Sequence, residues 1–175
     1  GRDAFEKAYT FLTKDVNDTT YSIIGYELLK TLSDNGTVNR GVCVADKNGN
    51  LVSIAERLNI ARKDGKILCD DDQQPKELPL DSQVSMNFWC FSPSIFSYSQ
   101  NLFNEFLTKN ISNIKSEFFI PIVADRFIND GRGVIKVIPT SAQWFGVTYK
   151  EDAPEVKENL NQLVQAGEYP PSLWK

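Results

Sequence analysis

The sequence predicts an α/β fold in which helices flank a mixed β-sheet. Segments with apolar residues at helical spacing alternate along the chain with short runs of β-branched and aromatic residues. Two of these strand-like runs flank Asn48-Gly49, a dipeptide that tolerates the positive φ of a tight hairpin turn. The 175 residues are enough for one domain with a sizeable core, and no internal repeat divides them.

The composition is that of a globular protein and argues against several kinds of partner. Apolar residues make up 41% of the chain and charged residues 24%. A net charge of −4 without any basic run argues against a nucleic acid held through its phosphates. No segment approaches the roughly 18 apolar residues of a membrane span, and nothing at the start resembles a signal peptide. We expect no nucleic-acid partner and no membrane.

Two residue types restrict the chemistry and the compartment. The chain contains no histidine, which removes Ser-His and Cys-His nucleophilic catalysis and most zinc sites. Cys43, Cys69 and Cys90 are widely spaced and form no CxxC pair. Two of them lie in apolar strand-like runs, so we expect buried free thiols in a reducing compartment, the cytoplasm.

The first third of the chain predicts one helix and three strands. Apolar residues at helical spacing predict a helix over residues 3–14, and a β-branched and aromatic run predicts a strand over 21–29. A hairpin follows, with strands at 41–45 and 51–55 joined by the turn 46–50. Because its first strand is almost wholly apolar, we expect that strand to be covered on both faces.

Each strand of this hairpin carries a candidate ligand contact. Gly41 offers a backbone amide that a ligand can approach closely, because glycine has no Cβ. Glu56 places a carboxylate where the apolar run stops, a usual position for ligand-facing residues in α/β sheets. The alternative is an ordinary hairpin that ends in a solvated Glu56-Arg57 pair.

The segment after the hairpin predicts a second, smaller excursion. Asp64-Gly65 is another hairpin turn signal between two short strands. Asp70, Asp71 and Asp72 suggest a metal site, but three consecutive carboxylates do not converge on one ion without special backbone geometry. We therefore expect a solvated acidic loop there. The proline-bearing residues 73–81 read as a connector.

A polar residue interrupts the next predicted strand, residues 84–91. Asn87 lies in an otherwise apolar, aromatic-rich run, so its amide must find partners in the fold or on a ligand. Ser92-Pro93 then predicts the start of a helix.

The rest of the chain predicts two more helices around one strand. A helix is expected over residues 116–128, with Glu117 in its first turn, where the helix dipole favours an anion. A strand over 134–139 and a short aromatic strand or loop over 143–149 follow. The last helix is expected from Asp152 to about residue 166.

Four segments, in order, resemble the sugar-1-phosphate nucleotidyltransferases, which have a Rossmann-like nucleotide-diphospho-sugar transferase fold. NRGVC with NGNLVSIAER resembles the family's hairpin ending in EKP, SMNFWCF its NaGiY strand, KSEFFIP its GE helix start, and QWFGVTY its W.DtGt loop. The likeness covers nearly the whole chain from Tyr21 onwards. It is closest to bacterial members that carry DDFYG directly before the segment that matches residues 2–5. It implies that the chain is the C-terminal, sugar-phosphate-binding portion of a longer enzyme.

The resemblance implies roles for five residues. The backbone N–H of Gly41 would bind the sugar, Glu56 and Asn87 would bind sugar hydroxyls, and Glu117 would be a weaker sugar contact. Arg57 replaces the family lysine that meets the sugar phosphate, and a guanidinium can hold a phosphate through two hydrogen bonds. The implied substrates are a sugar 1-phosphate and a nucleoside triphosphate, with Mg²⁺ as the cofactor.

Two departures bear on activity. The chain starts at Gly1 and not at a methionine. By resemblance it therefore lacks the upstream aspartate that holds magnesium and the glycine-rich loop that binds the triphosphate. Gly146 aligns with the aspartate that is the second magnesium ligand, and Glu151 or Asp152 are the candidates to replace it. We expect this stretch alone to bind no metal, to be catalytically inactive, and to self-associate through the strands 21–29 and 41–45, which would be left uncovered. The alternative is a non-catalytic sugar-phosphate-binding or regulatory domain of the same fold.

Overall fold

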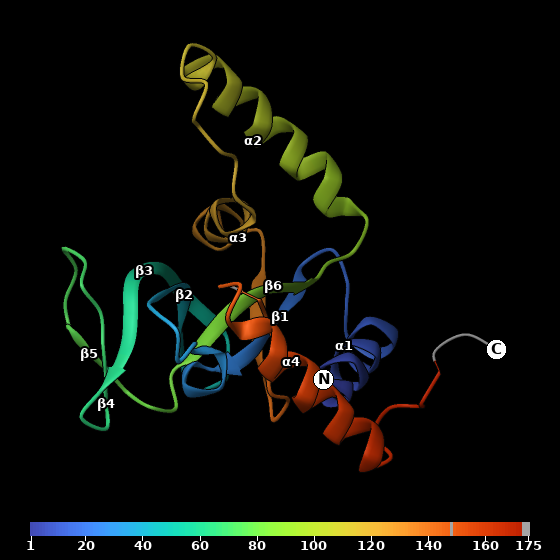
Figure 1. The fold of residues 1–175 in the computed structure, drawn as a ribbon. Helices are drawn as coiled ribbons and strands as arrows, with labels where there is room; N and C mark the ends of the chain where they lie inside the picture. The colour runs from blue at the N-terminus through green and yellow to red at the C-terminus, as the bar shows by residue number, and fades with distance from the viewer. Residues whose placement is uncertain (148, 173–175) are drawn as a thin grey trace.

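The computed structural model of the chain describes residues 1–147 and 149–172. Helices and strands are mixed along it, with the strands β2 to β6 in succession and α2 followed directly by α3 (Figure 1). The elements are α1 Arg2–Lys14, β1 Thr20–Glu27, the 3₁₀ helix η1 Leu28–Thr31, β2 Val38–Ala45, β3 Leu51–Lys63, β4 Lys66–Leu68, β5 Glu77–Leu78, β6 Gln83–Cys90, α2 Ser94–Asn110, α3 Ile120–Asn129, β7 Val134–Thr140 and α4 Asp152–Gln165.

Within the described residues, seven strands form one mixed sheet. Their order is β5-β4-β3-β2-β6-β1-β7. The β1–β7 pair is parallel, and the other neighbouring pairs are antiparallel. The predicted α/β class with a mixed sheet is confirmed. The finer assignment to a Rossmann-like nucleotidyltransferase fold stays a prediction.

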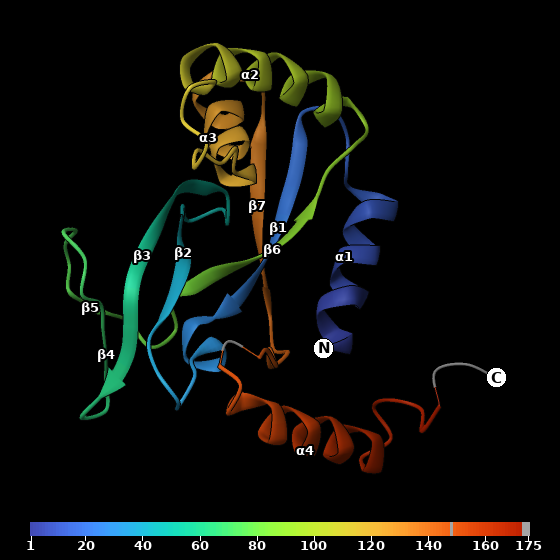
Figure 2. The same ribbon diagram turned by 45° about the horizontal axis from the view of Figure 1, so that its top comes forward.

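Two hydrophobic cores lie on opposite faces of the sheet. Side chains of β1 alternate between them, because successive residues of a strand point to opposite faces. Ile24 and Tyr26 pack with Ala4 and Ala8 of α1 in one core. Ile23 packs with α2 and α3 in the other. Figure 2 shows α1 along one side of the strands, α2 and α3 near one end of the sheet, and α4 across the opposite end.

The predicted hairpin is confirmed and is longer than expected. Gly49 adopts a φ of +75°, and the Asp46 carboxylate accepts hydrogen bonds from the backbone N–H groups of Asn48 at 2.8 Å and Asn50 at 2.9 Å. The expectation that the first strand is covered on both faces is wrong, since Val44 is 53% exposed. The reason is that β2 pairs with β6 only over residues 41–43, so its last residues extend beyond the neighbouring strand.

The tip of the hairpin folds onto the far edge of the sheet. The backbone N–H of Val137 on β7 donates to the carbonyl oxygen of Gly49 at 2.8 Å, and Asn50 forms an isolated antiparallel bridge with Lys136. The sheet is therefore curled, with a turn between β2 and β3 resting against β7. This contact fixes the direction in which β2 and β3 leave β6.

Strand β6 has a second partner only over its first half. Residues 83–85 pair with both β1 and β2, whereas Trp89 and Cys90 pair with β1 alone. Strand β1, which we expected to be an uncovered edge, is instead paired on both sides, with β6 and β7. One side of β6 is therefore unpaired over its second half, in addition to the edge strands β5 and β7, and self-association stays a prediction.

Helix α3 begins later than the sequence suggests. It starts at Ile120, after Phe119 in an extended conformation with φ of −89° and ψ of 140°. The expected start near residue 116 is therefore wrong, and Glu117 precedes the helix. Pro121 explains the shift, because a proline deeper inside a helix lacks a needed N–H and clashes with the preceding turn, whereas its place in the first turn costs little.

Among the described residues, no helix has the length and apolarity needed to cross a membrane.

Candidate functional site

Three of the predicted site residues line one small cavity. Its volume is about 230 Å³, and it lies where β2, β3 and β6 meet, with α3 and the segment after β7 on its sides. The lining residues are Asn39, Arg40, Gly41, Glu56, Ser85, Met86, Asn87, Pro121 and Trp144. The structure thus brings Gly41, Glu56 and Asn87 together, and their role in binding stays a prediction.

Strand register explains why these residues meet. Gly41 on β2 lies opposite Glu56 on β3 and, on its other side, opposite Ser85 on β6. A Cβ at position 41 would lie 3.1 Å from Cδ1 of Ile54 and 3.4 Å from Cβ of Ser85. The first of these distances is shorter than an ordinary carbon–carbon contact. A larger residue at position 41 would therefore crowd Ile54 and fill part of the cavity.

A bulge in β6 turns the Asn87 side chain toward the cavity. The register of β1 and β6 shifts between Ile23 and Gly25, so the residues around Asn87 are displaced from regular pairing. Asn87 has a φ of +55°, a conformation that asparagine tolerates better than most residues, and its N–H donates to Ser85 Oγ at 3.1 Å. Among the described residues, no hydrogen bond holds its side-chain amide. The amide is therefore available to a ligand.

The Glu56 carboxylate faces the half-buried cation of Arg40. Partial burial raises the pKa of Glu56, while the charge of Arg40 opposes that rise. Burial lowers the pKa of Arg40, and the charge of Glu56 opposes that change. Within the described chain the two carboxylate oxygens of Glu56 accept no hydrogen bond, so they are free for hydroxyl donors.

Arg40 and Trp144 are site residues that the sequence reasoning missed. The Arg40 guanidinium donates to Thr31 Oγ1 at 3.2 Å and to the Asn39 carbonyl at 2.8 Å. Its Cζ lies 5.1 Å from the centre of the Trp144 ring, within cation–π range. Arg40 thus holds the tryptophan as a wall of the cavity. The sequence offered only the proximity of Arg40 to Gly41 as a signal.

Arg57 points away from the cavity into a buried ion pair. Its Nε donates to Asp71 Oδ2 at 2.7 Å, and its Nη2 donates to Asp71 Oδ1 at 3.1 Å and to the Pro75 carbonyl at 2.7 Å. The Arg57 and Asp71 side chains are only 5% and 3% exposed. Alternation along β3 explains the direction, because neighbouring Glu56 takes the opposite face. The expected contact of Arg57 with a phosphate has no support in this geometry.

The same ion pair corrects the expectation of a solvated acidic loop. Asp70 and Asp72 are exposed, but Asp71 is not. The hydrogen bond from Arg57, with further bonds from the backbone N–H groups of Leu58 and Gln73, holds the pKa of Asp71 well below its ordinary range. The loop is therefore anchored to β3 by the Arg57–Asp71 ion pair.

Glu117 lies outside the small cavity. It is exposed in the segment before α3 and lines none of the cavities described here. The neighbouring Phe118 and Phe119 line a larger, adjoining cavity. The expected weak sugar contact of Glu117 thus receives no support, because α3 begins after it and not before it.

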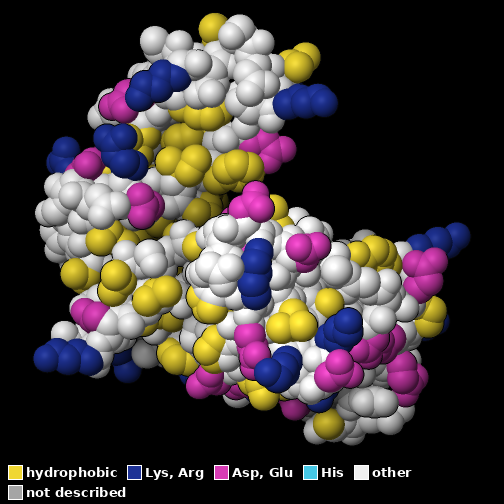
Figure 3. All heavy atoms as spheres, turned by 90° about the vertical axis from the view of Figure 1, so that its left-hand side faces the viewer, with side chains coloured by type: hydrophobic (Ala, Val, Ile, Leu, Met, Phe, Trp, Pro, Cys, Tyr) yellow, Lys and Arg dark blue, Asp and Glu magenta, His cyan; other side chains and the backbone are white. Residues whose placement is uncertain are grey.

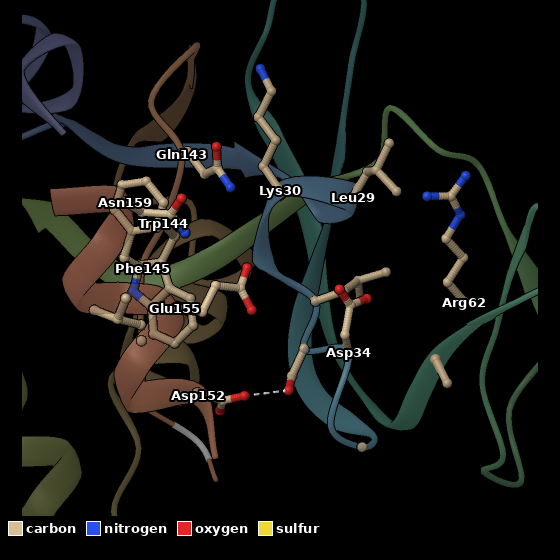
Figure 4. Close-up of a pocket in the computed structure, with 16 residues that line it drawn as sticks. Leu29, Lys30, Asp34, Arg62, Gln143, Trp144, Phe145, Asp152, Glu155 and Asn159 are labelled. Carbon is tan, nitrogen blue, oxygen red and sulfur yellow. Dashed lines mark hydrogen bonds between the residues drawn. The ribbon is translucent and has the colours of Figure 1, made fainter. Parts of the chain in front are cut away.

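Gly146 has a local structural explanation. A Cβ at this position would lie 1.7 Å from the Trp144 ring, so only glycine lets the tryptophan fold back over the chain. Asp152, at the start of α4, accepts a hydrogen bond from Ser33 Oγ at 2.9 Å (dashed line in Figure 4) and another from Asn35 Nδ2 at 2.7 Å. Asp152 therefore ties α4 to the loop between η1 and β2. No group of three or more His, Cys, Asp or Glu side chains in residues 1–147 and 149–172 is placed to hold a metal ion.

We expect Gly146→Asp to move Trp144 away from Arg40. The added Cβ would overlap the indole ring of Trp144. The ring would move, because a side chain can rotate whereas the Cβ is fixed by the backbone. The tryptophan emission spectrum should shift to longer wavelength as the ring becomes more hydrated. The same substitution in a Trp144→Phe background should leave the spectrum unchanged. An equal shift in both backgrounds would contradict the contact.

Comparisons with known proteins do not identify the chain. No protein-family model matches it, and no curated protein matches it either.

Proposed function

We propose that the chain is the sugar-phosphate-binding portion of a nucleotidyltransferase, an enzyme that joins a sugar 1-phosphate to a nucleoside triphosphate and releases pyrophosphate. The observation that carries the proposal is the convergence of Gly41, Glu56 and Asn87 on one cavity. The resemblance assigns all three residues to sugar binding, and the motifs that contain them follow one another in the family's order. Each is separated from the next by more than ten residues, so the convergence is a property of the fold.

The chemistry of the cavity suits a polyhydroxylated ligand. A carboxylate accepts hydrogen bonds from hydroxyl groups, and an asparagine amide both donates and accepts them. The open floor at Gly41 lets a ligand approach the backbone, and the Trp144 ring supplies an apolar wall. A small number of polar groups beside an aromatic side chain is typical of sites that bind small molecules.

The transfer reaction itself needs groups beyond this cavity. In the proposed reaction a phosphate oxygen of the sugar phosphate attacks the α-phosphorus and pyrophosphate leaves, with positioning and charge neutralisation giving most of the rate. The described residues provide no set of ligands for the magnesium ion that the family uses. We therefore assign no step to a metal here.

Calorimetric titration with a panel of sugar 1-phosphates tests the proposal. We expect binding by at least one member, and a roughly 10- to 100-fold loss of affinity in Glu56→Gln, since hydrogen bonds to charged groups contribute about 1.5–3 kcal/mol. Asn87→Ala should weaken binding of the same ligand. Glu158→Gln, an exposed change on α4, is the matched control and should have no effect. Absence of binding by every sugar 1-phosphate, or equal affinity in all variants, would refute the proposal.

The second candidate function is a non-catalytic sugar-phosphate-binding or regulatory domain. Gly146 favours it, because the position has no carboxylate and the Trp144 ring occupies the space that one would need. A pyrophosphate-release assay with magnesium, four nucleoside triphosphates and the sugar phosphate that binds tests whether these 175 residues catalyse the transfer by themselves. We expect binding without release from these 175 residues. Release that Glu56→Gln abolishes would assign catalysis to the chain itself.

A further inference from the structure

A second cavity adjoins the candidate site and is about four times as large. Its volume is about 940 Å³, against about 230 Å³ for the first. Asn39, Glu56, Asn87 and Pro121 line both cavities. A ligand held by Glu56 and Asn87 is therefore in direct reach of the second space.

The remaining lining of the second cavity is mostly hydrocarbon. It comes from β3 and from the start of α3 and comprises Ile54, Leu58, Phe118, Phe119, Ile120, Ile122, Asp125 and Arg126. Four of these apolar side chains are strongly exposed: Leu58 at 40%, Phe119 at 52%, Ile120 at 47% and Ile122 at 43%. Single exposed apolar residues are ordinary, but four along one cavity form a surface that gains from being covered. On the face drawn in Figure 3, hydrophobic side chains gather in the hollow below the lobe at the top.

Besides Glu56, two charged residues line this cavity, and both have partners. Arg126 forms ion pairs with Asp130 at 3.5 Å and with Glu105 at 3.8 Å. Asp125 accepts a hydrogen bond from Asn129 at 3.0 Å. Arg126 is thus ion-paired, and Asp125 and Glu56 are both carboxylates, so the cavity offers little to an anionic ligand.

The start of α3 is also unsuited to an anion. A helix N-terminus binds phosphate through free backbone N–H groups. Here Pro121 has none, and the N–H of Ile122 donates to the Phe119 carbonyl at 3.0 Å. Positions 121 and 122 therefore offer a ligand no free backbone N–H, and their side chains are hydrocarbon.

We propose that the ligand of the candidate site carries an apolar acyl or alkyl substituent that occupies the second cavity. This inference rests on the proposed function, because it extends a ligand already held by Glu56 and Asn87. The substituent would contact Leu58, Phe119 and Ile122 while the sugar hydroxyls face the polar residues. The substrate class is thus an acylated or alkylated sugar 1-phosphate and not a plain one.

Three N-acylglucosamine 1-phosphates, with acetyl, butanoyl and hexanoyl groups, serve as probes in calorimetric titrations. Burial of one CH₂ contributes at most about 0.8 kcal/mol, or roughly fourfold in affinity, and partial burial gives less. We expect affinity to rise at least twofold for each added CH₂. Ile122→Asn should remove most of this rise, whereas Glu56→Gln should weaken all three probes by the same factor.

Ile114→Asn is the matched control, because Ile114 is 99% exposed and lines neither cavity. It should leave the whole series unchanged. A flat or falling affinity along the series, with the acetyl compound still bound through Glu56, would overturn this inference and leave the proposed function standing. Failure of every probe and every plain sugar 1-phosphate to bind would refute the proposed function, and this inference with it.

Discussion

Replacement of Arg57 by alanine is expected to lower the melting temperature by roughly 10 °C. Removal of one partner of a buried ion pair leaves the other charge buried without compensation, which is among the most destabilising of single changes. Here the uncompensated group is Asp71, whose side chain is 3% exposed. The Pro75 carbonyl loses its donor at the same time. Thermal unfolding followed by circular dichroism at pH 7 measures the effect.

Arg62→Ala is the control for this experiment. Arg62 lies on the same strand, but it is exposed and the structure gives it no ion pair among the described residues. Its melting temperature should stay within about 2 °C of the unmodified protein, as is usual for surface changes. Similar losses in both variants would show that the Arg57–Asp71 pair does not stabilise the fold.

The Arg57 effect also depends on pH in a defined direction. The folded state lowers the pKa of Asp71, so the stability that this carboxylate contributes is complete above its unfolded pKa of about 4. That contribution is lost as the pH falls below 4 toward the lower folded pKa. The gap in melting temperature between the unmodified protein and Arg57→Ala should therefore narrow from pH 5 to pH 3.

The same variant separates a structural role from a ligand-binding role. Sugar 1-phosphate affinity, measured well below the melting temperature of Arg57→Ala, should stay within about twofold, because the guanidinium does not line the cavity. A tenfold loss would instead assign to Arg57 the phosphate contact that the family resemblance implies.

Gly133→Ala is expected to destabilise the protein by about 3 kcal/mol, a typical upper cost of overpacking. A Cβ at this position would lie 2.0 Å from the carbonyl oxygen of Thr19 and 2.6 Å from its carbonyl carbon. Both atoms belong to the backbone and cannot rotate away. The neighbouring N–H of Val134 donates to that same oxygen at 2.9 Å, so the added methyl would force β7 away from the start of β1.

Gly131→Ala, two residues earlier in the same turn, gives the comparison. Gly131 has a φ of +65° and open space where its Cβ would be, so alanine there costs only the conformational strain of about 1 kcal/mol. Denaturant unfolding should therefore rank Gly133→Ala as clearly less stable than Gly131→Ala. The reverse order would contradict the close backbone approach at Thr19.

Local patterns in the sequence were enough to predict much of the fold. Asn48-Gly49 and Asp64-Gly65 predict both hairpin turns, and both glycines adopt positive φ. Helical spacing of apolar residues predicts α1, whose Ala4 and Ala8 are buried. These features depend on neighbours within a few residues, which is the range over which turn and periodicity signals act.

Features set by distant contacts were not predictable in this way. Asp71 looks solvated because its neighbours are acidic, yet Arg57, fourteen positions earlier, buries and neutralises it. Trp144 reaches the cavity only because Arg40 holds its ring, a contact that no spacing rule reveals. The proximity of Gly41, Glu56 and Asn87 came from the family resemblance, and local pattern alone would have left each an isolated residue.

The parallel pairing of β1 with β7 has a consequence for how the chain folds. Thr20 lies beside Val134, so this part of the sheet closes only after most of the chain is available. During synthesis, the start of β1 emerges early, and its apolar side chains remain without their partner strand until β7 leaves the ribosome. In such long-range pairing, the chain loses the conformational entropy of a long loop before the contacts between the two strands stabilise it. We therefore expect the pairing of β1 with β7 to be a late step in folding.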